Sequence, residues 1–374
     1  MSSFTILLLA SGDAMAYRVL RCAAATGARI HVLGTSDEGR SRRLTWSRHC
    51  ASYHSQDDGA FEPGDAAVGV INELVAQLGI DLVVPGDAIT QRFLARHAAR
   101  LKTARTFPSP DAATLERLRD KAQFAALCAE LDVPHPATCL LPDGDTVRRG
   151  IESGTLRLPV MVKPTDLAGG LGVRQLHGER AAADAAALPY QPVLLQDFVP
   201  GHDVSISFFC DAGTVRASAM YRYVDETYVF FFDQALHDMA SRVVTAVGYT
   251  GAVGFDARIG PTGEMWLIEC NPRFTYHVDI SMLAGVNLVA LGQALAPGTG
   301  GEVRAAPQRI QHAKLLKPWT LWRGDRRHAR YILDDSLRFT LWVAVRDFVR
   351  QKLTAPAWAR IGRVAASTEP RAVS

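Results

Sequence analysis

The sequence predicts an α/β protein in which a parallel α/β domain comes first, an α+β region follows, and a helical tail ends the chain. Three observations lead to this prediction. Apolar strands alternate with helical segments at the start, two strands joined by Gly-Pro-Thr-Gly lie within residues 252–271, and helical spacing returns in DDSLRFTLWVAVRDFVRQKL. Strands that alternate with helices indicate a parallel sheet covered by helices.

The first domain is built on the strand FTILLLA, residues 4–10, which ends in Ser11-Gly12-Asp13. We expect a helix over AMAYRVLRCAAATG, a strand over RIHVLGTS, a helix over VGVINELVAQLGI and a strand over DLVVPGD. Ligands of such sheets lie at the carboxyl ends of the strands. The SGD and PGD loops are therefore candidate binding loops, although no G-x-G-x-x-G motif supports a dinucleotide.

The prolines of FPSP mark a boundary, after which ERLRDKAQFAALCAEL has helical spacing. The stretch LPVMVKPTDLAGGLGVRQL predicts a strand, a glycine-rich loop and a second strand. PVLLQDFVPGHDVSISFFC predicts strand, turn and strand, and AVGFDARIGPTGEMWLIECN predicts a hairpin between two helices.

Composition limits the class of protein. The chain has 374 residues, enough for two or three domains. No stretch is apolar for the ~20 residues that a membrane span needs, and the N-terminal apolar run is too short for a signal peptide. Six scattered cysteines without a CxxC pair suggest neither a disulfide framework nor a zinc site, so we expect a cytoplasmic protein.

The tail differs from the rest in charge. From residue 311 onward it has 13 basic and 5 acidic residues, a net charge of +8, whereas the rest of the chain carries −5. It also has four of the six tryptophans, Trp319, Trp322, Trp342 and Trp358. This asymmetry leaves two hypotheses open: a helix that rests on the inner face of an anionic membrane, or a helix that packs against the body or a second copy.

The hairpin carries the strongest chemical signal. Glu269 and Asn271 are two residues apart on one strand, so their side chains share a face. Asp256 and Arg258 have the same spacing on the partner strand, and such pairs converge across a hairpin. Two carboxylates, an amide and the nearby Arg273 suit Mg²⁺ that bridges nucleotide phosphates. The alternative is a surface hairpin with solvated charges.

Two further segments fit the same ligand. Lys163 ends an apolar strand and is followed by Gly169, Gly170 and Gly172, whose backbone N–H groups can fold over phosphates. The turn in LLQDFVPGHDV offers backbone groups of Asp197 to Val199 to a flat base, and Asp203 can accept from ribose hydroxyls. Each alone is equally consistent with an ordinary hairpin.

The order of these pieces is more specific than any one of them. Lys121 in RDKAQF and Lys163 in VMVKP precede the glycine loop, QDFVPGHD, GFDAR and ECNPR. In this order the chain resembles the ATP-grasp superfamily, most closely its carbamoyl-phosphate-synthetase-like carboxylate–amine ligases, over about residues 1–300. The resemblance implies an ATP-grasp fold with a pre-grasp domain at 1–110, a small lid subdomain at 111–192, a large subdomain at 193–300, and a linker and tail at 301–374.

The resemblance also implies roles for individual residues. Those expected to bind ATP are Lys121, Lys163, Gly169, Gly170, Gly172, Gln196, Asp197, Val199 and Asp203. Those expected to hold the metal are Asp256, Glu269 and Asn271. Arg273, Lys163 and Arg258 are expected to act in catalysis. The chain departs from the common pattern at Gln196, where many members have glutamate, and at Asp203, which is shorter than the usual glutamate.

The expected activity is amide formation. ATP would phosphorylate a carboxylate, an amine would attack the acyl phosphate, and Mg²⁺ or Mn²⁺ would assist. For the second substrate we expect Arg222, whose guanidinium suits a carboxylate, and Tyr276 and His277, which follow the NPR motif. A kinase and a non-catalytic nucleotide-binding regulator are the alternatives, a homodimer is a candidate assembly, and no nucleic-acid partner is expected.

Overall fold

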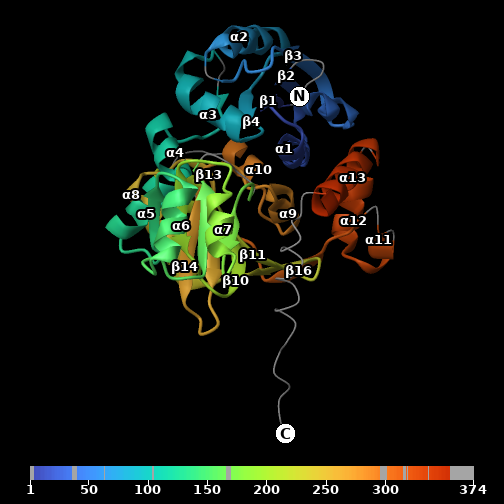
Figure 1. Ribbon diagram of the computed structural model, residues 1–374. Helices are drawn as coiled ribbons and strands as arrows, with labels where there is room; N and C mark the ends of the chain where they lie inside the picture. Colours follow the sequence, from blue (N-terminus) through green and yellow to red (C-terminus); the bar gives the residue numbers. More distant parts are fainter. Residues whose placement is uncertain are drawn as a thin grey trace.

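The computed structural model has three β-sheets with helices on their faces (Figure 1). It describes residues 4–35, 40–62, 64–102, 105–165, 170–294, 301–314, 317, 319–335 and 337–353. The predicted succession of a parallel α/β unit, an α+β region and C-terminal helices is confirmed.

The N-terminal sheet is parallel, with the strand order β3-β2-β1-β4-β5. Its strands are β1 (Thr5–Ala10), β2 (Arg29–Thr35), β3 (Cys50–Gln56), β4 (Leu82–Pro85) and β5 (Arg105–Thr106). Its helices are α1 (Ala14–Ala24), α2 (Ala66–Leu78) and α3 (Ala88–His97), with short 3-10 segments η1 (Arg40–Trp46) and η2 (Ala98–Arg100). Helix α1 packs on one face of β1 and α2 on the other, which explains why this strand is apolar throughout.

The strand order reverses between β1 and β4, so the loops that follow these two strands lie side by side. The backbone N–H groups of Ser11 and Gly12 donate to Asp87 Oδ2 at 2.7 and 3.1 Å. The other oxygen of Asp87 caps α3 by accepting from the backbone N–H groups of Ile89 and Thr90. The SGD and PGD loops are therefore joined into one rigid edge of the sheet.

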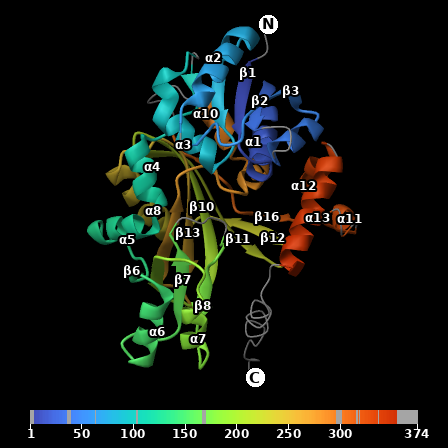
Figure 2. The same cartoon turned by 45° about the horizontal axis from the view of Figure 1, so that its top comes forward.

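The second sheet is small and antiparallel, with the order β6-β9-β7-β8. Its strands are β6 (Thr138–Leu141), β7 (Val160–Pro164), β8 (Arg174–Leu176) and β9 (Val193–Asp197), and its helices are α6 (Gly144–Glu152) and α7 (Ala181–Ala186). Figure 2 shows this unit projecting from the large sheet on the side away from the N-terminal domain. Because β9 belongs to it, the small sheet extends beyond the predicted boundary at residue 192 to Asp197.

The large sheet runs β14-β13-β10-β11-β12-β16, and β15 pairs with β11. Its strands are β10 (His202–Asp211), β11 (Thr214–Val224), β12 (Thr227–Phe231), β13 (Gly251–Ile259), β14 (Met265–Asn271), β15 (Val303–Arg304) and β16 (Gln308–Gln311). Helices α5 (Lys121–Glu130) and α8 (Gln234–Ala246) cover one face, whereas α9 (Val278–Leu283), α10 (Leu288–Ala294) and α1 cover the other. Helix α4 (Ala112–Arg119) precedes α5. Strands β15 and β16 extend this sheet beyond residue 300, into the expected linker.

The C-terminal helices are α11 (Trp319–Arg323), α12 (Arg326–Leu333) and α13 (Leu337–Leu353), and Figure 1 shows them against the N-terminal domain. The side chain of Phe339 is fully buried, and its ring stacks on that of Tyr17 in α1 with 3.9 Å between centroids. The hypothesis that the tail packs against the body is therefore confirmed for this face of α13. Trp358 lies outside the described residues.

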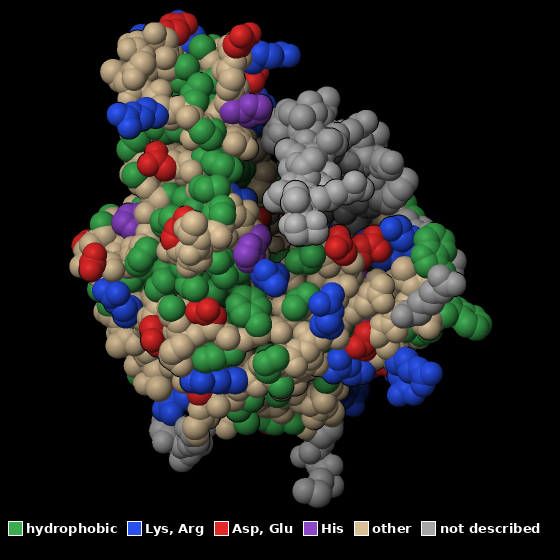
Figure 3. All heavy atoms as spheres, turned by 90° about the horizontal axis from the view of Figure 1, so that it is seen from below, with side chains coloured by type: hydrophobic (Ala, Val, Ile, Leu, Met, Phe, Trp, Pro, Cys, Tyr) green, Lys and Arg blue, Asp and Glu red, His purple; other side chains and the backbone are tan. Residues whose placement is uncertain are grey.

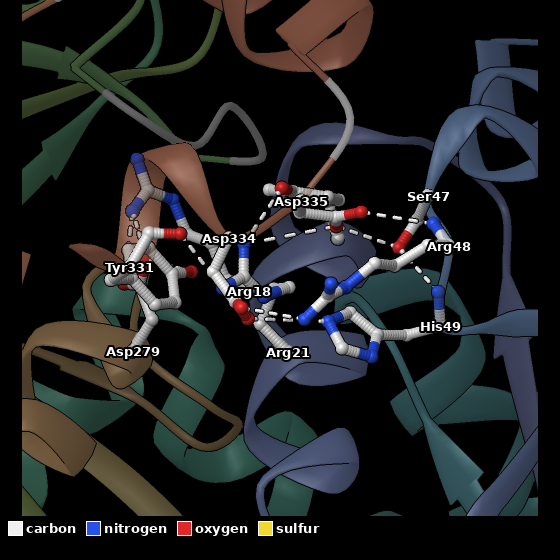
Figure 4. Close-up of polar contacts among 10 residues, drawn as sticks. Arg18, Arg21, Ser47, Arg48, His49, Asp279, Tyr331, Asp334 and Asp335 are labelled. Atoms are coloured by element: carbon white, nitrogen blue, oxygen red, sulfur yellow. Dashed lines mark hydrogen bonds and ion pairs between the residues drawn. The ribbon is translucent and has the colours of Figure 1, made fainter. Parts of the chain in front are cut away.

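A polar network fixes the junction of α12 and α13 on the N-terminal domain (Figure 4). Asp335 accepts from the Ser47 hydroxyl at 2.7 Å and from the backbone N–H of Arg48 at 2.9 Å. Asp334 pairs with the Arg48 guanidinium at 2.5 Å, and Arg21 donates to the carbonyl of Tyr331 at 2.7 Å. Two acids at the end of α12 thus determine where α13 starts.

A buried ion pair joins three parts of the chain. Arg18 of α1 donates to both carboxylate oxygens of Asp279 in α9, at 2.9 and 2.7 Å, and the Tyr331 hydroxyl of α12 donates to the same carboxylate at 2.7 Å. Burial raises the pKa of Asp279, but Arg18 and Tyr331 outweigh burial, so its pKa is lowered. The stabilisation is therefore present near neutral pH and is lost as the pH falls through the folded-state pKa.

We expect Asp279→Ala to lower the free energy of unfolding by about 3–5 kcal/mol, because Arg18 would be left buried without a partner. Urea denaturation at neutral pH measures the change. Glu152→Ala is the matched control, since it breaks the exposed Arg148–Glu152 pair of α6 and should change stability by only about 0–1 kcal/mol. Equal effects of the two variants would contradict the prediction.

Candidate active site

The polar end of the β13–β14 hairpin forms as the sequence predicted. Asp256 pairs directly with Glu269 across the hairpin, and Ile268 is the extra residue of a bulge beside this pair. The Asn271 amide nitrogen lies 3.3 Å from Asp256 Oδ2 and 3.5 Å from Glu269 Oε1. The three predicted metal ligands therefore converge on one face of the sheet.

The carboxylates of Asp256 and Glu269 lie close to each other. Burial, followed by the charge of Glu269, raises the pKa of Asp256 to about 7. Burial also lowers the pKa of Arg273, while Asp256 and Glu269 act in the opposite direction. Neighbouring acids in a buried place are stabilised by a cation, so this donor set fits Mg²⁺.

Arg273 and Asn271 are linked at the end of β14. Arg273 Nη2 donates to Asn271 Oδ1 at 3.0 Å, and Nη1 donates to the carbonyl of Phe274 at 2.9 Å. The amide nitrogen of Asn271, rather than its oxygen, faces the carboxylates. To ligate a metal through oxygen, this amide would have to turn over and give up its hydrogen bond from Arg273.

Lys163 is the next-to-last residue of β7 and is buried. Its ammonium donates to Gln196 Oε1 at 2.7 Å, and Gln196 Nε2 donates to the Thr138 hydroxyl at 3.0 Å. Burial lowers the pKa of Lys163, while the charges of Glu269 and Asp256 raise it. Lys163 therefore faces the carboxylates from the small sheet. Gln196 therefore holds this lysine.

The glycine loop connects β7 to β8. Gly170 and Gly172 have φ values of 73° and 75°, a conformation that favours glycine. The Tyr190 hydroxyl donates to the carbonyl of Gly172 at 2.8 Å and fixes the end of the loop. Gly169 lies outside the described residues, so its role stays a prediction.

Arg258 lies at the predicted base-binding segment. Its Nη1 donates to the carbonyl of Val199 at 2.7 Å, and its Nε lies 3.0 Å from Asp203 Oδ1. Asp203 is well exposed, and Asp197 is exposed at the end of β9. These contacts place Arg258 at the expected base and ribose end, so the structure does not pair it with the metal carboxylates. Its catalytic role stays a prediction.

A cavity of about 220 Å³ opens at the end of β14, between the large sheet and the N-terminal domain. Lys121, the first residue of α5, lines it together with Glu269, Asn271 and Arg273. The other lining residues are Ala88, Gln91, Arg92, Leu115, Arg119, Thr165, Cys270 and Pro272. Four cationic side chains and a single carboxylate line this space; Arg92 also pairs with Glu62, and Arg119 pairs with Glu116 at 2.7 Å.

Comparisons with known proteins agree with this geometry. A family model described as "ATP-grasp in the biosynthetic pathway with Ter operon" matches residues 189–317. Carboxyaminoimidazole ribonucleotide synthase from Aspergillus clavatus, solved in complex with ATP, superposes with a TM-score of 0.60 at 16% identity and covers 86% of each chain. L-amino acid ligase from Bacillus licheniformis superposes with a TM-score of 0.59 at 16% identity, over 78% of this chain and 74% of that one. The chain has the ATP-grasp fold.

A curated relative extends this resemblance to sequence. The arginine-specific carbamoyl phosphate synthase large chain of Geobacillus stearothermophilus is 23% identical over 203 residues, which are 49% of this chain and 19% of the relative. The chain thus matches about a fifth of that relative's length. The predicted resemblance to the ATP-grasp superfamily is confirmed.

The residues expected to bind the second substrate do not lie together in this structure. Tyr221 pairs with Ser205, which pairs with Asp256, so Tyr221 lies on the metal face of the large sheet. Arg222, the next residue, lies on the opposite face, where its Nη1 is 3.1 Å from His202 Nε2. The structure therefore does not bring Arg222 to the site, because alternate residues of a strand point to opposite faces.

Tyr276 and His277 follow Arg273 in the loop that leads to α9. The Arg18 guanidinium lies over the Tyr276 ring, 4.4 Å from its centroid. His277 Nδ1 lies 3.2 Å from the Tyr228 hydroxyl, and burial lowers the pKa of His277 to about 3. His277 is thus a neutral, hydrogen-bonded imidazole, whereas Tyr276 lies among cations near the site.

Sequence reasoning missed Arg92 and Arg119. Arg119 stands two residues before Lys121 in RLRDKAQF, and Arg92 follows the PGD loop on α3. The strand–loop–helix pattern predicted a binding loop at PGD. It did not identify these two arginines, because in the sequence a charged residue on a solvated helix face looks the same as a charged residue that lines a cavity. Only the packing of α3 and α4 beside β14 distinguishes the two.

We expect Lys163→Met to weaken MgADP binding about ten- to hundred-fold, because a hydrogen bond between charged groups contributes roughly 1.5–3 kcal/mol. Isothermal titration calorimetry measures the dissociation constant. Lys314→Met is the matched control, since Lys314 bonds Glu226 at the β11–β12 turn. If the two variants bound MgADP with equal affinity, Lys163 would not belong to the nucleotide site.

Proposed function

We propose that this protein is an ATP-dependent carboxylate–amine ligase that releases ADP and phosphate. The observation that carries the proposal is the cavity at the end of β14, where Glu269 and Asn271 of the metal group meet four cationic side chains. The ligases among the proteins of similar fold support the same class of reaction.

In the proposed reaction, different residues of the site would hold the metal, bind the phosphates and stabilise the phosphoryl group. Asp256, Glu269 and Asn271 would hold Mg²⁺, which neutralises phosphate charge when bound. Among the described residues no group of three or more His, Cys, Asp and Glu side chains could hold a metal ion by itself. Lys163 and Lys121 would bind the phosphates from the small sheet and from α5.

Arg273 would stabilise the negative charge that develops as the phosphoryl group moves to the acid. Arg92 and Arg119 come from α3 and α4 on the far wall of the same cavity, so they would orient the carboxylate toward the nucleotide. The amine would then attack the acyl carbon, form the amide and release phosphate.

ADP release screened over carboxylates crossed with amines, with mass spectrometry of the products, tests this function. Release that needs both an acid and an amine, with an amide product, supports the ligase. Release with an acid alone indicates a kinase. MgADP binding without release for any pair indicates a non-catalytic regulator.

Glu269→Gln should lower kcat about 10²–10³-fold, because removing one group that stabilises the transition state costs roughly 3–4 kcal/mol. The side chain keeps its shape, so the thermal unfolding temperature should stay close to that of the parent. ADP release under saturating substrates measures the effect. Release at the parent rate would show that Glu269 does not hold the metal.

We further propose that the outer face of the C-terminal helices contacts an anionic membrane surface. Leu337, Leu341, Val345 and Val349 recur every four residues on α13 and are exposed, as are Trp319 and Trp322 on α11. In Figure 3, hydrophobic and basic side chains lie together at the right edge, the side on which Figure 1 places α11 to α13. None of the helices that the structure describes has the length and apolarity to cross a bilayer.

The double variant Leu341→Glu/Val345→Glu should no longer sediment with phosphatidylglycerol liposomes, whereas the parent should, because two carboxylates would meet the anionic surface. Leu140→Glu is the matched control, since Leu140 is 49% exposed on the small sheet. Sedimentation that is the same for parent and double variant would end the membrane proposal. Loss of a dimer in analytical ultracentrifugation would assign this face to a second copy.

A further inference from the structure

Helix α3 of the N-terminal domain presents a neutral polar side chain to the cavity at the end of β14. Ala88, Gln91 and Arg92 line this cavity, and their spacing of three and four residues places them on one face of the helix. The helix is held by Asp87, which caps it and joins the SGD and PGD loops. Gln91 therefore stands in the cavity wall on a fixed element.

The hydrogen bonds of Gln91 determine which end of its amide is engaged. Gln91 Nε2 lies 2.9 Å from the Ser109 hydroxyl, and that hydroxyl lies 3.0 Å from the carbonyl of Phe107. A hydroxyl has one proton and a carbonyl can only accept, so Ser109 donates to Phe107 and accepts from Gln91. The donor end of the amide is thus turned to Ser109, and the carbonyl oxygen is left for another partner.

The carbonyl oxygen of Gln91 can be reached from the cavity. Among the residues that the structure describes, none donates a hydrogen bond to Gln91 Oε1, and the residue is 4% exposed. The oxygen is nevertheless not fully enclosed, in contrast to Gln293 Oε1, which is enclosed and lacks a partner within the described chain. Because Gln91 lines the cavity, its oxygen is open to a molecule that occupies this space.

The anchor of this amide is tied to both sides of the site. Phe107 is 1% exposed, and its backbone N–H donates to the carbonyl of Val83 in β4 at 2.8 Å. Its ring lies against that of Phe274, the residue after Arg273, with 4.9 Å between centroids. The position of Gln91 relative to the end of β14 is therefore set by packing.

The chemistry of a carbonyl oxygen indicates which substrate it meets. Such an oxygen only accepts hydrogen bonds, and phosphates and an ionised carboxylate also offer only acceptors, so neither would be stabilised by Gln91. The base and ribose of ATP carry donors, but they are expected at the Val199 and Asp203 end of the site. The amine is the remaining substrate with N–H donors. A hydrogen bond through N–H leaves its lone pair free to be directed at the acyl carbon.

We propose that Gln91 is a specificity-determining residue whose side-chain carbonyl accepts an N–H of the amine substrate and orients that amine toward the acyl group. This inference rests on the proposed ligase function and places the amine between α3 and the end of β14. Residue 91 lies outside the stretch 189–317 that the family model matches, so the matched family does not by itself imply this role.

The test measures ADP release and amide formation by the full chain with MgATP, using the acid identified in the screen at a saturating concentration and varying its amine. Gln91→Met removes the acceptor and keeps the length of the side chain. It should lower kcat/KM for the amine about three- to tenfold, the effect of losing one hydrogen bond between neutral groups. KM for the acid and the affinity for MgADP should stay at the parent values.

Gln91→Glu separates amine binding from a purely structural role. Both variants lose the N–H that Ser109 accepts, but glutamate keeps an oxygen acceptor at the same place. Gln91→Glu should therefore retain a higher kcat/KM for the amine than Gln91→Met does. Gln234→Met is the matched control, because it removes an exposed side-chain amide that bonds Asp238 on α8.

Three results would overturn the inference. The first is a kcat/KM for the amine that is the same in Gln91→Met as in the parent or in Gln234→Met. The second is an equal loss in Gln91→Glu and Gln91→Met, which would show that only the contact with Ser109 matters. The third is a raised KM for the acid instead of the amine.

A binding measurement separates this inference from the proposed function. Calorimetry titrates the MgADP-loaded protein with ammonium, ethanolamine and L-amino acids. An amine that binds the parent and binds Gln91→Met more weakly, without ADP release from any pair, would retain the amine position and reject the ligase. Amide formation with an equal kcat/KM for the amine in both proteins would retain the ligase and reject the inference. No amine binding together with no ADP release would overturn both.

Discussion

The ion pair between Arg18 and Asp279 is the constraint on which the rest of the structure depends. It ties α1 of the parallel domain to α9, the first helix after the loop that carries Arg273 and Tyr276. The Tyr331 hydroxyl adds α12 to the same carboxylate. Because the pair is buried, the loop between β14 and α9 cannot shift without exposing an unpaired charge.

That fixed loop allows the site to be assembled from distant parts. The carboxylates proposed to hold the metal come from two strands of the large sheet, Lys163 from the small sheet and Lys121 from the start of α5. The α3 and α4 side chains complete the cavity wall. Phosphoryl transfer requires mainly positioning and charge compensation, so rigid elements are suitable supports for these groups.

Helix α13 of the tail has one face that packs against the body and one face that is exposed. One face stacks Phe339 on Tyr17 and brings Arg346 to Asp13, whereas the other leaves a row of aliphatic side chains exposed. Packing thus accounts for the apolar residue Phe339 on the inner face of this helix. The basic residues of the tail likewise divide between contacts with the body, such as Arg346, and the outer surface.

Local patterns in the sequence determined the kinds of structure. The apolar run of β1, the helical spacing of α1 and the Gly-Pro-Thr-Gly turn predicted their elements, because strand, helix and turn preferences act over a few residues. The two-residue spacing of Glu269 and Asn271 also determined their common face. The order of motifs was sufficient to predict the ATP-grasp fold.

Packing between segments that are far apart in the chain decided which side chains reach the site, because the spacing of residues in the sequence does not show this. In the sequence, Arg222 looks like a substrate-binding arginine. In the structure, the strand register places its side chain on the face of the sheet opposite to Asp256. Arg92, Arg119 and Arg346 carry no local signal, since their neighbours in space lie tens to hundreds of residues away in the chain. The sequence by itself therefore determined the elements and the common face of Glu269 and Asn271, whereas the tertiary structure decided which cations surround them, because only packing brings separate helices to one strand end.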